Sequence, residues 1–304
     1  FTSLYSKSKT DSKMPTLVTH NGQFHADEVT ACYILKTLYP SLKLQRSRDP
    51  KIIEDAQFVV DVGKEYSEEA DHFDHHQDEF EETFPGSSIR LSSAGLVYRA
   101  YGREFLGALA KKYRQEPLTE EVFEDLYASF YFLFIKEIDA IDNGLTPFDP
   151  ASRPPFYIHT NLSSEVAMLN TLDVYSPEQQ IRFELALELV EARIKIHFLS
   201  LREKAFYKAK DSIFVKNAME KRYKYDTEGR ILVLKGDCPN WYNCIREHER
   251  TEDVCIWYIL YPNKNTWRVR GLADNRILRC PLLSKEELLE TGKIKEEEHL
   301  FVHR

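Results

Sequence analysis

Short apolar runs alternate with amphipathic segments over the first part of the chain. Residues 58–62 read Phe-Val-Val-Asp-Val, which is typical of a buried strand. Helical periodicity follows the first apolar run, and the Asn21-Gly22 pair between them indicates a turn. Strands that alternate with helices indicate βαβ units and a mostly parallel sheet. The pattern predicts strands at 17–20, 43–48 and 58–62, and helices at 27–38 and 52–56.

Two more helices are predicted before the chain loses its periodicity. One begins at Ser92-Ser93-Ala94-Gly95 and runs to about residue 101. The other covers residues 122–141 and is unusually aromatic, so we expect it to be buried against the sheet. Gly144 stands at its predicted end. Residues 146–176 contain several prolines without strong periodicity, which is typical of a connector.

The pattern changes twice in the second half of the chain. Ser176 and Pro177 suit the start of a helix that continues to about residue 221, long enough for two helices or for a spine between domains. From residue 230 the period becomes two, which predicts strands, the last two forming a hairpin. These strands cover 231–234, 255–260 and 267–270, and residues 284–298 are predicted to form a charged helix.

These elements predict an α/β fold with a mostly parallel, doubly wound sheet and a second, smaller α+β domain. We expect a flexible tail at residues 1–13 and a first domain at 14–175. Residues 176–304 would supply the long helix and the second, smaller domain.

Composition narrows the classes of protein to which the chain can belong. A net charge of −8 argues against a protein that coats nucleic acid by charge alone. The five cysteines are scattered without the spacing of a zinc site, so we expect reduced thiols in an intracellular protein. The sequence has no long apolar run, so no membrane span is expected. Residues 1–13 suit the end of a transit peptide or, as we prefer, a flexible tail.

Histidines and acids follow several of the predicted elements. They come after the first strand, within and after the buried strand, and at the end of the aromatic helix. Because ligands bind at the carboxyl ends of parallel strands, we expect these side chains to meet there and to bind metal. Imidazoles and carboxylates without thiols suit Mn²⁺, with Mg²⁺, Fe and Zn²⁺ also compatible. The candidates are His20, His25, Asp27, Asp61, Asp74, His75, His76, Asp139 and Asp142.

This ligand set exceeds the needs of one ion, so we expect two ions about 3.5–4 Å apart, as in phosphoryl-transfer sites. Asp61 is the natural bridge, because it stands alone at the end of the central strand. The competing interpretations are helix caps and a buried carboxylate satisfied by hydrogen bonds. Ser92 and Ser93 suit a helix cap, with phosphate contact as the lesser alternative. Arg268 and Arg270 could bind phosphate or lie on the solvent-exposed face of a strand, and the sequence leaves both alternatives open. The tryptophans are predicted to lie in the core, at Trp241, Trp257 and Trp267.

At these residues the sequence resembles the DHH phosphoesterase superfamily, whose signature includes an Asp-His-His triplet like residues 74–76. Longer strings resemble the eukaryotic MYG1 proteins: THNGQFHADE at 19–28, VVDVG at 59–63, DHHQ at 74–77, LSSAGLVY at 91–98 and IDAIDNG at 138–144. The resemblance covers about residues 15–145. The second half resembles the family less, although Trp267–Arg270 and Leu300–His303 look like its signatures and 272–283 looks shortened.

The resemblance implies a manganese-type 3′→5′ RNA exonuclease of mitochondria and nucleus, with RNA as its partner. By resemblance, His20 and His25 would bind one ion, and Asp27 and His75 the other, with Asp61 between them. Asp142 would be the last ligand and Asp139 the fallback. His76 would touch the scissile phosphate, and Asp74 would orient a neighbouring histidine. The catalytic residues would then be Asp74, His75 and His76, with Arg268 and Arg270 as candidates for substrate binding.

Two other functions compete with the exonuclease. The first is a phosphatase or pyrophosphatase that acts on a small molecule, which a deep and closed cleft would favour. The second is a non-catalytic factor that binds RNA or the ribosome and keeps the DHH fold. The acidic net charge and the divergent second half motivate this alternative. The cytoplasm, the nucleus and the mitochondrion all remain open as compartments.

Overall fold

The computed structural model describes residues 16–148, 156–236, 238–252, 255–264 and 266–272. The chain divides into two compact units, residues 1–202 and 203–304. Each unit has its own sheet. The predicted helix at 284–298 lies outside the described residues.

The first unit is built on a five-stranded sheet in the order β2-β1-β3-β5-β4. Four strands run parallel, namely β2 (Lys43–Arg46), β1 (Thr16–Thr19), β3 (Phe58–Val60) and β5 (His72–Phe73). Only the edge strand β4 (Tyr66–Ser67) is antiparallel. The prediction of a mostly parallel sheet is therefore confirmed. Strands β4 and β5 were not predicted, because two residues are too few to show a period.

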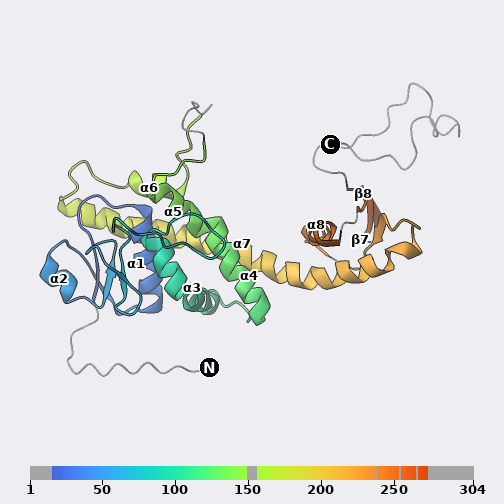
Figure 1. Ribbon diagram of the computed structural model, residues 1–304, viewed down its shortest axis with the longest axis horizontal. Coiled ribbons are helices and arrows are strands. Elements are labelled where there is room, and N and C mark those ends of the chain that lie inside the picture. The colour runs from blue at the N-terminus through green and yellow to red at the C-terminus, as the bar shows by residue number, and fades with distance from the viewer. Residues whose placement is uncertain (1–15, 149–155, 237, 253–254, 265, 273–304) are drawn as a thin grey trace. The chain divides into compact units, whose positions relative to one another are not determined.

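Helices cover both faces of this sheet, so it is doubly wound as predicted (Figure 1). On one face, α2 (Pro50–Glu54) places Ile52 and Ile53 against the buried valines of β1 and β3. On the other face, α1 (Ala26–Leu38) and α3 (Ser93–Lys112) pack against each other. The burial of consecutive residues in β1 and β3 follows from this cover on two sides.

The predicted aromatic helix is interrupted by a π-helical turn. It consists of α4 (Glu120–Phe130), the π turn Tyr131–Ile135 and α5 (Lys136–Asp142). A π turn adds a residue to the turn and so rotates the residues after it about the helix axis; such turns are frequent at functional sites. Of the three acids of α5, Asp139 is buried, Asp142 is half-buried and Glu137 is exposed.

Asp139 of α5 caps the start of α3. Its Oδ1 accepts hydrogen bonds from Ser92 N at 3.0 Å, Ser92 Oγ at 2.8 Å and Gly95 N at 3.1 Å. These N–H groups have no partner within the helix, and the helix dipole favours a negative charge beside them. Helix α3 runs well beyond its predicted end near residue 101.

The connector contains one short helix, α6 (Leu162–Ala167), before the long helix α7 (Pro177–Lys221). Helix α7 is a single helix, and the two units divide within it, after Arg202. Its first part is buried in the first unit through Phe183, Ala186, Val190, Ile194 and Phe198. The sequence placed the boundary at the start of this helix, whereas its buried face ties the first part to the first unit.

The second unit is an α+β domain around a three-stranded sheet in the order β6-β7-β8. Strands β7 (Tyr258–Asn263) and β8 (Thr266–Gly271) form the predicted hairpin, and β6 (Ile231–Val233) runs parallel to β7. Helix α8 (Trp241–Glu252), which was not predicted, packs Trp241 and Ile245 into the core with the end of α7. A 3₁₀ turn at Arg222–Lys224 follows α7.

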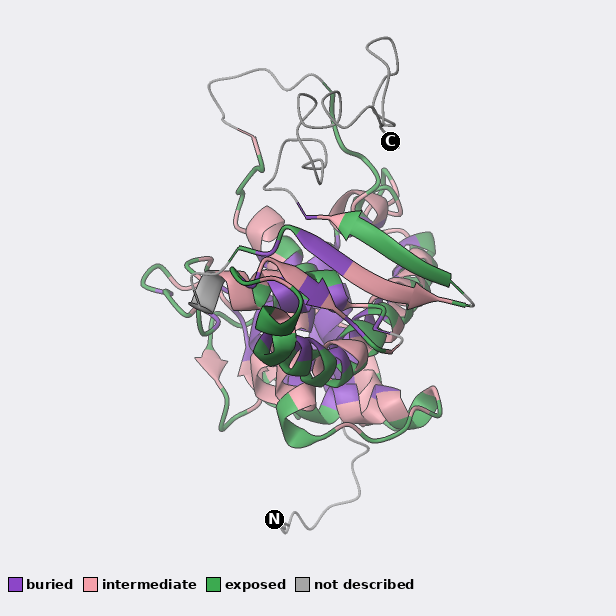
Figure 2. Ribbon diagram, turned by 90° about the vertical axis from the view of Figure 1, so that its right-hand side faces the viewer, coloured by how far each residue is buried: buried purple, intermediate pink, exposed green. Residues whose placement is uncertain are grey.

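Strand β8 is exposed along most of its length and is the green strand in Figure 2. Trp267 on this strand is 57% exposed, and Trp257 before β7 is 41% exposed. The prediction of a core position is confirmed for Trp241 and is wrong for Trp257 and Trp267. Period two alone does not say whether a second layer covers both faces of a strand.

Two predictions from composition can be compared with the described residues. Cys32, Cys238, Cys244 and Cys255 are all free cysteines, as expected. Over the same residues, every helix is too short or too polar to cross a membrane.

The cap of α3 predicts opposite effects for two substitutions in one helix. A Cβ on Gly95 would lie 2.5 Å from both carboxylate oxygens of Asp139, whereas Gly107 has open space around it. We expect Gly95→Ala to destabilise the first unit by about 2 kcal/mol or more. Gly107→Ala should stabilise it by about 0.5–1 kcal/mol, because alanine favours the helix.

Thermal unfolding followed by circular dichroism would measure both changes. All three tryptophans lie in the second unit, so tryptophan fluorescence serves as the internal control and should not shift. Equal effects of the two substitutions would contradict the close contact at Gly95.

Candidate metal centre

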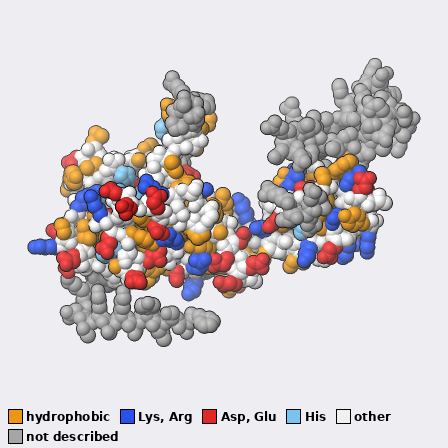
Figure 3. Space-filling model, viewed as in Figure 1, with side chains coloured by type: hydrophobic (Ala, Val, Ile, Leu, Met, Phe, Trp, Pro, Cys, Tyr) orange, Lys and Arg blue, Asp and Glu red, His pale blue; other side chains and the backbone are white. Residues whose placement is uncertain are grey.

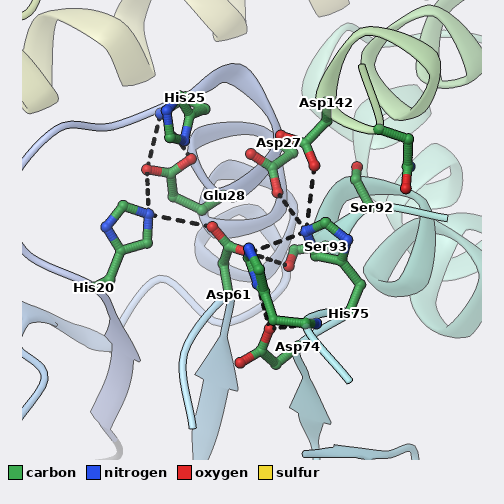
Figure 4. Close-up of polar contacts among 12 residues, drawn as sticks. His20, His25, Asp27, Glu28, Asp61, Asp74, His75, Ser92, Ser93 and Asp142 are labelled. Atoms are coloured by element: carbon green, nitrogen blue, oxygen red, sulfur yellow. Dashed lines mark hydrogen bonds and ion pairs between the residues drawn. The ribbon is translucent and has the colours of Figure 1, made fainter. Parts of the chain in front are cut away.

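The predicted histidines and acids converge at the carboxyl edge of the parallel sheet (Figure 4). His20 follows β1, Asp61 follows β3, and the triplet Asp74-His75-His76 follows β5. The start of α1 contributes Asp27, and the end of α5 contributes Asp142. Neighbouring parallel strands end side by side, which brings together residues that are far apart in the chain.

Asp61 lies between two sets of possible ligands. Its Oδ2 is 3.2 Å from His20 Nε2, and its Oδ1 is 3.3 Å from His75 Nε2. On the first side, His20 Nε2 also lies 3.1 Å from Glu28 Oε1. On the second side, His75 Nε2 lies 3.2 Å from Asp142 Oδ2 and 3.9 Å from Asp27 Oδ2. The two oxygens of Asp61 therefore face different groups, as a bridging carboxylate requires.

Three groups of side chains could each hold a metal ion, because the ligand atoms within each group lie within 4.8 Å of one another. Asp61 belongs to two of these groups, and so does His25. The groups are His20, His25, Glu28 and Asp61; Asp61, His75 and His76; and His25, Asp27 and Asp142.

The backbone and charge of Asp61 are both unusual. Its φ of 56° lies in the left-handed region, which costs a non-glycine residue on the order of 1 kcal/mol or more. Burial raises the pKa of its carboxyl group, but hydrogen bonds and charges from His20 and His75 outweigh burial and hold this pKa below its usual range. Ser93 Oγ donates to Oδ1 at 3.0 Å. The fold thus fixes an ionised carboxylate at the centre of the cluster.

Asp27 provides the test of whether a cation fits this site. Both of its oxygens are buried and meet no hydrogen-bond donor in the described part of the chain. Burial, followed by the charges of Asp61 and Asp142, raises the pKa of Asp27 well above its ordinary value. An unpaired buried carboxylate is costly without a cation. Oxygen and imidazole ligands without thiols fit the Mn²⁺ or Mg²⁺ ions that the sequence predicts.

His20 carries positive charge within the same cluster. Burial lowers its pKa, but hydrogen bonds to Asp61 and Glu28 raise it more, to about 10. A protonated His20 therefore balances part of the negative charge in the absence of metal. Metal binding would displace this proton, since only the neutral imidazole can be a ligand.

Asp74 orients His76, as the sequence resemblance implies. Asp74 Oδ1 accepts from His76 N at 3.1 Å and lies 2.8 Å from His76 Nδ1, while its Oδ2 accepts from Lys64 N at 2.6 Å. The contact with Asp74 raises the pKa of His76. The His76 side chain is 57% exposed, so its remaining ring nitrogen is available to a ligand.

Of the two candidate ligands in α5, Asp139 and Asp142, the structure brings only Asp142 to the cluster. Asp139 is buried at the cap of α3, and burial raises its pKa to about 7 despite its hydrogen bonds from Ser92 and Gly95. The fallback ligand is thus a structural cap, and Ser92 is its partner. Arg268 and Arg270 lie on β8 in the second unit, where Arg270 stacks 5.5 Å from the ring centre of Trp241. Their role in substrate binding stays a prediction.

The sequence analysis missed two members of the cluster, Glu28 and Ser93. Glu28 was interpreted only as an acid at the start of a helix, yet it is fully buried and reaches His20. Its carboxylate also accepts from His25 N at 2.9 Å and 3.0 Å. The spacing of His25 and Glu28, three residues apart at a helix start, was the available signal. Ser93 carried no signal that separates it from Ser92.

Distant residues clamp the loop that carries His20 and His25. Arg46 donates to His20 O at 3.2 Å and to Gly22 O at 2.7 Å. Gln179 of α7 donates to Gly22 O at 3.0 Å, and Asn170 bonds both backbone groups of Phe24. The connector and the first part of α7 therefore help to position the ligands.

The cluster forms the floor of a cleft of about 1450 Å³. The strand ends, the α2 region, α5, α6 and the connector line this cleft. Its lining includes two cations, Arg48 and Lys64, and the aromatic ring of Tyr175. On the face shown in Figure 3, acidic and basic side chains of the first unit intermingle.

Because Asp27 is unpaired, replacing it should stabilise the metal-free protein and harm the metal-bound form. Asp27→Asn removes a buried carboxyl group whose ionised form meets no donor among the described residues, so it should raise the metal-free unfolding free energy by about 1–3 kcal/mol. It should also abolish the stabilisation that Mn²⁺ gives to the wild-type protein. Thermal unfolding with EDTA and with Mn²⁺ would measure both effects, with the exposed Asp78→Asn as the matched control.

The same residue predicts how stability depends on pH. The folded, metal-free protein holds a proton on Asp27 that the unfolded chain loses above its ordinary pKa of 3.8. Metal-free stability should therefore fall as the pH rises above about 4, and Asp27→Asn should reduce this slope. A metal-free variant that is less stable than the wild type and still stabilised by Mn²⁺ would contradict the assignment.

Comparisons with known proteins identify the relatives of this chain. The model of the uncharacterised protein family UPF0160, named for the MYG1 exonuclease, matches residues 16–303. The mouse MYG1 exonuclease is 34% identical over 269 residues, which cover 84% of this chain and 68% of the mouse protein. The Dictyostelium discoideum MYG1 protein is 35% identical over 279 residues, which cover 88% and 82%.

A crystal structure of the exonuclease RecJ bound to manganese aligns with 90% of this chain and 80% of RecJ, at 15% identity and a TM-score of 0.24. The family match and the identity to the MYG1 proteins are sufficient by themselves: this chain belongs to the MYG1 family.

Proposed function

We propose that the protein is a metal-dependent phosphodiesterase that shortens RNA from its 3′ end. The observation that carries this proposal is the position of Asp61, whose two oxygens face His20 on one side and His75 on the other. Such an arrangement suits two ions that share one carboxylate, and Mn²⁺ is the proposed ion, with Mg²⁺ as the alternative. The mouse relative is named an exonuclease, which supports the same reaction class.

The ligand groups suggest how two ions would be held. One would lie among His20, His25, Glu28 and Asp61, and the other among Asp27, Asp61, His75 and Asp142. When bound, the ions would lower the pKa of a water molecule and stabilise negative charge on the phosphate. In the hydrolysis, the water oxygen bonds to phosphorus, the bond to the 3′ oxygen breaks, and that oxygen takes a proton.

His76 is the residue best placed to act on the phosphate directly. Its Nδ1 contacts Asp74, which fixes the ring and raises the pKa of the imidazole. A protonated His76 would donate its second N–H to a phosphate oxygen. Asp74 would keep the ring in the required orientation, as carboxylates do for histidines in many active sites.

The size of the cleft favours a polymer over a small molecule. Sites for small ligands usually measure about 300–1000 Å³, and this cleft measures about 1450 Å³. A small-molecule phosphatase is therefore the weaker proposal. The convergent ligand groups also argue against a purely non-catalytic factor. RNA is the proposed partner, and association with the ribosome stays a prediction.

RNA oligomers labelled at either end would test the proposed reaction. With Mn²⁺, a 5′-labelled RNA should shorten stepwise, while a 3′-labelled RNA should release one labelled mononucleotide at once. His75→Ala removes the side chain that faces Asp27, Asp61 and Asp142, so the rate should fall by more than about 100-fold.

The control is His159→Ala, because His159 is exposed and lies outside the cleft lining. It should cleave RNA at the wild-type rate. Cleavage that survives EDTA, or that His75→Ala leaves unchanged, would overturn the metal-dependent proposal. Internal fragments in place of a ladder would overturn the exonuclease.

A further inference from the structure

One cation in the lining of the cleft, Arg48, lies outside the candidate metal cluster. Arg48 follows β2 and lines the cleft with an exposed side chain. This side chain makes no hydrogen bond or ion pair with any residue in the described ranges, whereas the half-buried Arg99 and Arg193 of the same unit are paired. An unpaired guanidinium that faces an active-site cleft suits an anionic ligand, and phosphate matches its planar donors.

Tyr175 offers an aromatic surface at the same cleft. Its ring is 76% exposed, yet it rests on the loop between the two histidine ligands, since a Cβ on Gly22 would lie 3.6 Å from its Cε1 atom. The backbone of Tyr175 is held as well, because its N–H donates to Asp173 Oδ1 at 3.2 Å. A large ring that is fixed at one edge and otherwise open suits stacking on a base.

The ring of Tyr175 and the strand end that leads to Arg48 both contact the same short loop. Arg46 donates to Gly22 O at 2.7 Å and lies two residues before Arg48, while the ring of Tyr175 lies over Gly22. Strand β2 pairs with β1, so the end of β2 lies about 5 Å from the end of β1, where His20 begins the metal centre. The strand end that leads to Arg48 and the ring of Tyr175 therefore both lie beside the loop that starts at His20, and both side chains line the same cleft.

We propose that Arg48 and Tyr175 form a nucleotide subsite next to the metal centre. Arg48 binds the phosphate that neighbours the scissile bond, and Tyr175 stacks on the base of that nucleotide. The subsite deepens the proposed function and rests on it: it gives the cleft a preference for nucleic acid over simple phosphodiesters. Stacking tolerates any base, so the subsite holds the strand without sequence preference.

Binding of RNA tests the subsite without need of catalysis. The probe is a fluorescein-labelled RNA decamer with phosphorothioate linkages, which resist hydrolysis, and its anisotropy is followed with the full chain in Mn²⁺. Tyr175→Ala should weaken binding about tenfold, and Tyr175→Phe should not, because the ring alone stacks. Arg48→Ala should weaken binding and lower the slope of log affinity against log salt by about 0.7, the value of one phosphate contact with a single strand.

Two matched variants control for general effects on the surface. Tyr157 is an exposed tyrosine outside the cleft lining, and Lys51 is an exposed cation on α2 outside it. Tyr157→Ala and Lys51→Ala should bind RNA as the wild type does. Cleavage of unmodified RNA and of bis(p-nitrophenyl) phosphate, a diester without a base, gives the second readout. Tyr175→Ala should lose far more kcat/KM on RNA than on the small diester.

The outcomes separate this subsite from the proposed function. If the wild type cleaves neither substrate while Tyr175→Ala and Arg48→Ala still weaken RNA binding, the phosphodiesterase is wrong and the subsite stands. Unchanged binding in both variants, or no binding of RNA by the wild type, overturns the subsite. Equal losses on RNA and on the small diester also overturn it, because they show that the residues only position the histidine loop.

Discussion

The mutual repulsion of carboxylates at the sheet edge is the constraint on which the first unit depends. Asp27, Asp61 and Asp142 approach one another in a site that largely excludes water, and Asp27 meets no donor among the described residues. Protonated His20 offsets only part of this charge. Bound cations would offset the rest and would be tightly held, because the fold has already brought the ligands together.

Several elements act together to hold these charges in place. The strained backbone at Asp61 directs its carboxylate between the two ligand sets, and Ser93 fixes one of its oxygens. Two acids of α5, the helix that follows the π turn, have different contacts: Asp139 caps α3, and Asp142 reaches the cluster. Arg46 and Gln179 clamp the histidine loop from two other elements. The centre is thus positioned by most of the unit.

The sequence by itself determined the class of fold and predicted most members of the candidate metal cluster. The hydrophobic periodicity shows which segments form strands and which form helices. Because neighbouring parallel strands end at one edge of the sheet, the convergence of His20, Asp61 and His75 was predictable. The family strings added the role of each residue. The connection of Asp74 to a histidine also followed from them, and the structure places that contact at His76.

The tertiary structure alone decided features that depend on the rotation of a helix about its axis and on contacts between distant elements. Asp139 and Asp142 stand three residues apart on one helix, and only their packing shows which of them reaches the candidate metal cluster. In the sequence, Glu28 is only an acid at the start of a helix, and its burial against His20 is visible only in the structure. Tyr175 and Arg48 lie far apart in the chain, and only the tertiary fold puts both at one cleft. Local patterns record which residues form an element, whereas long-range packing sets which atoms meet.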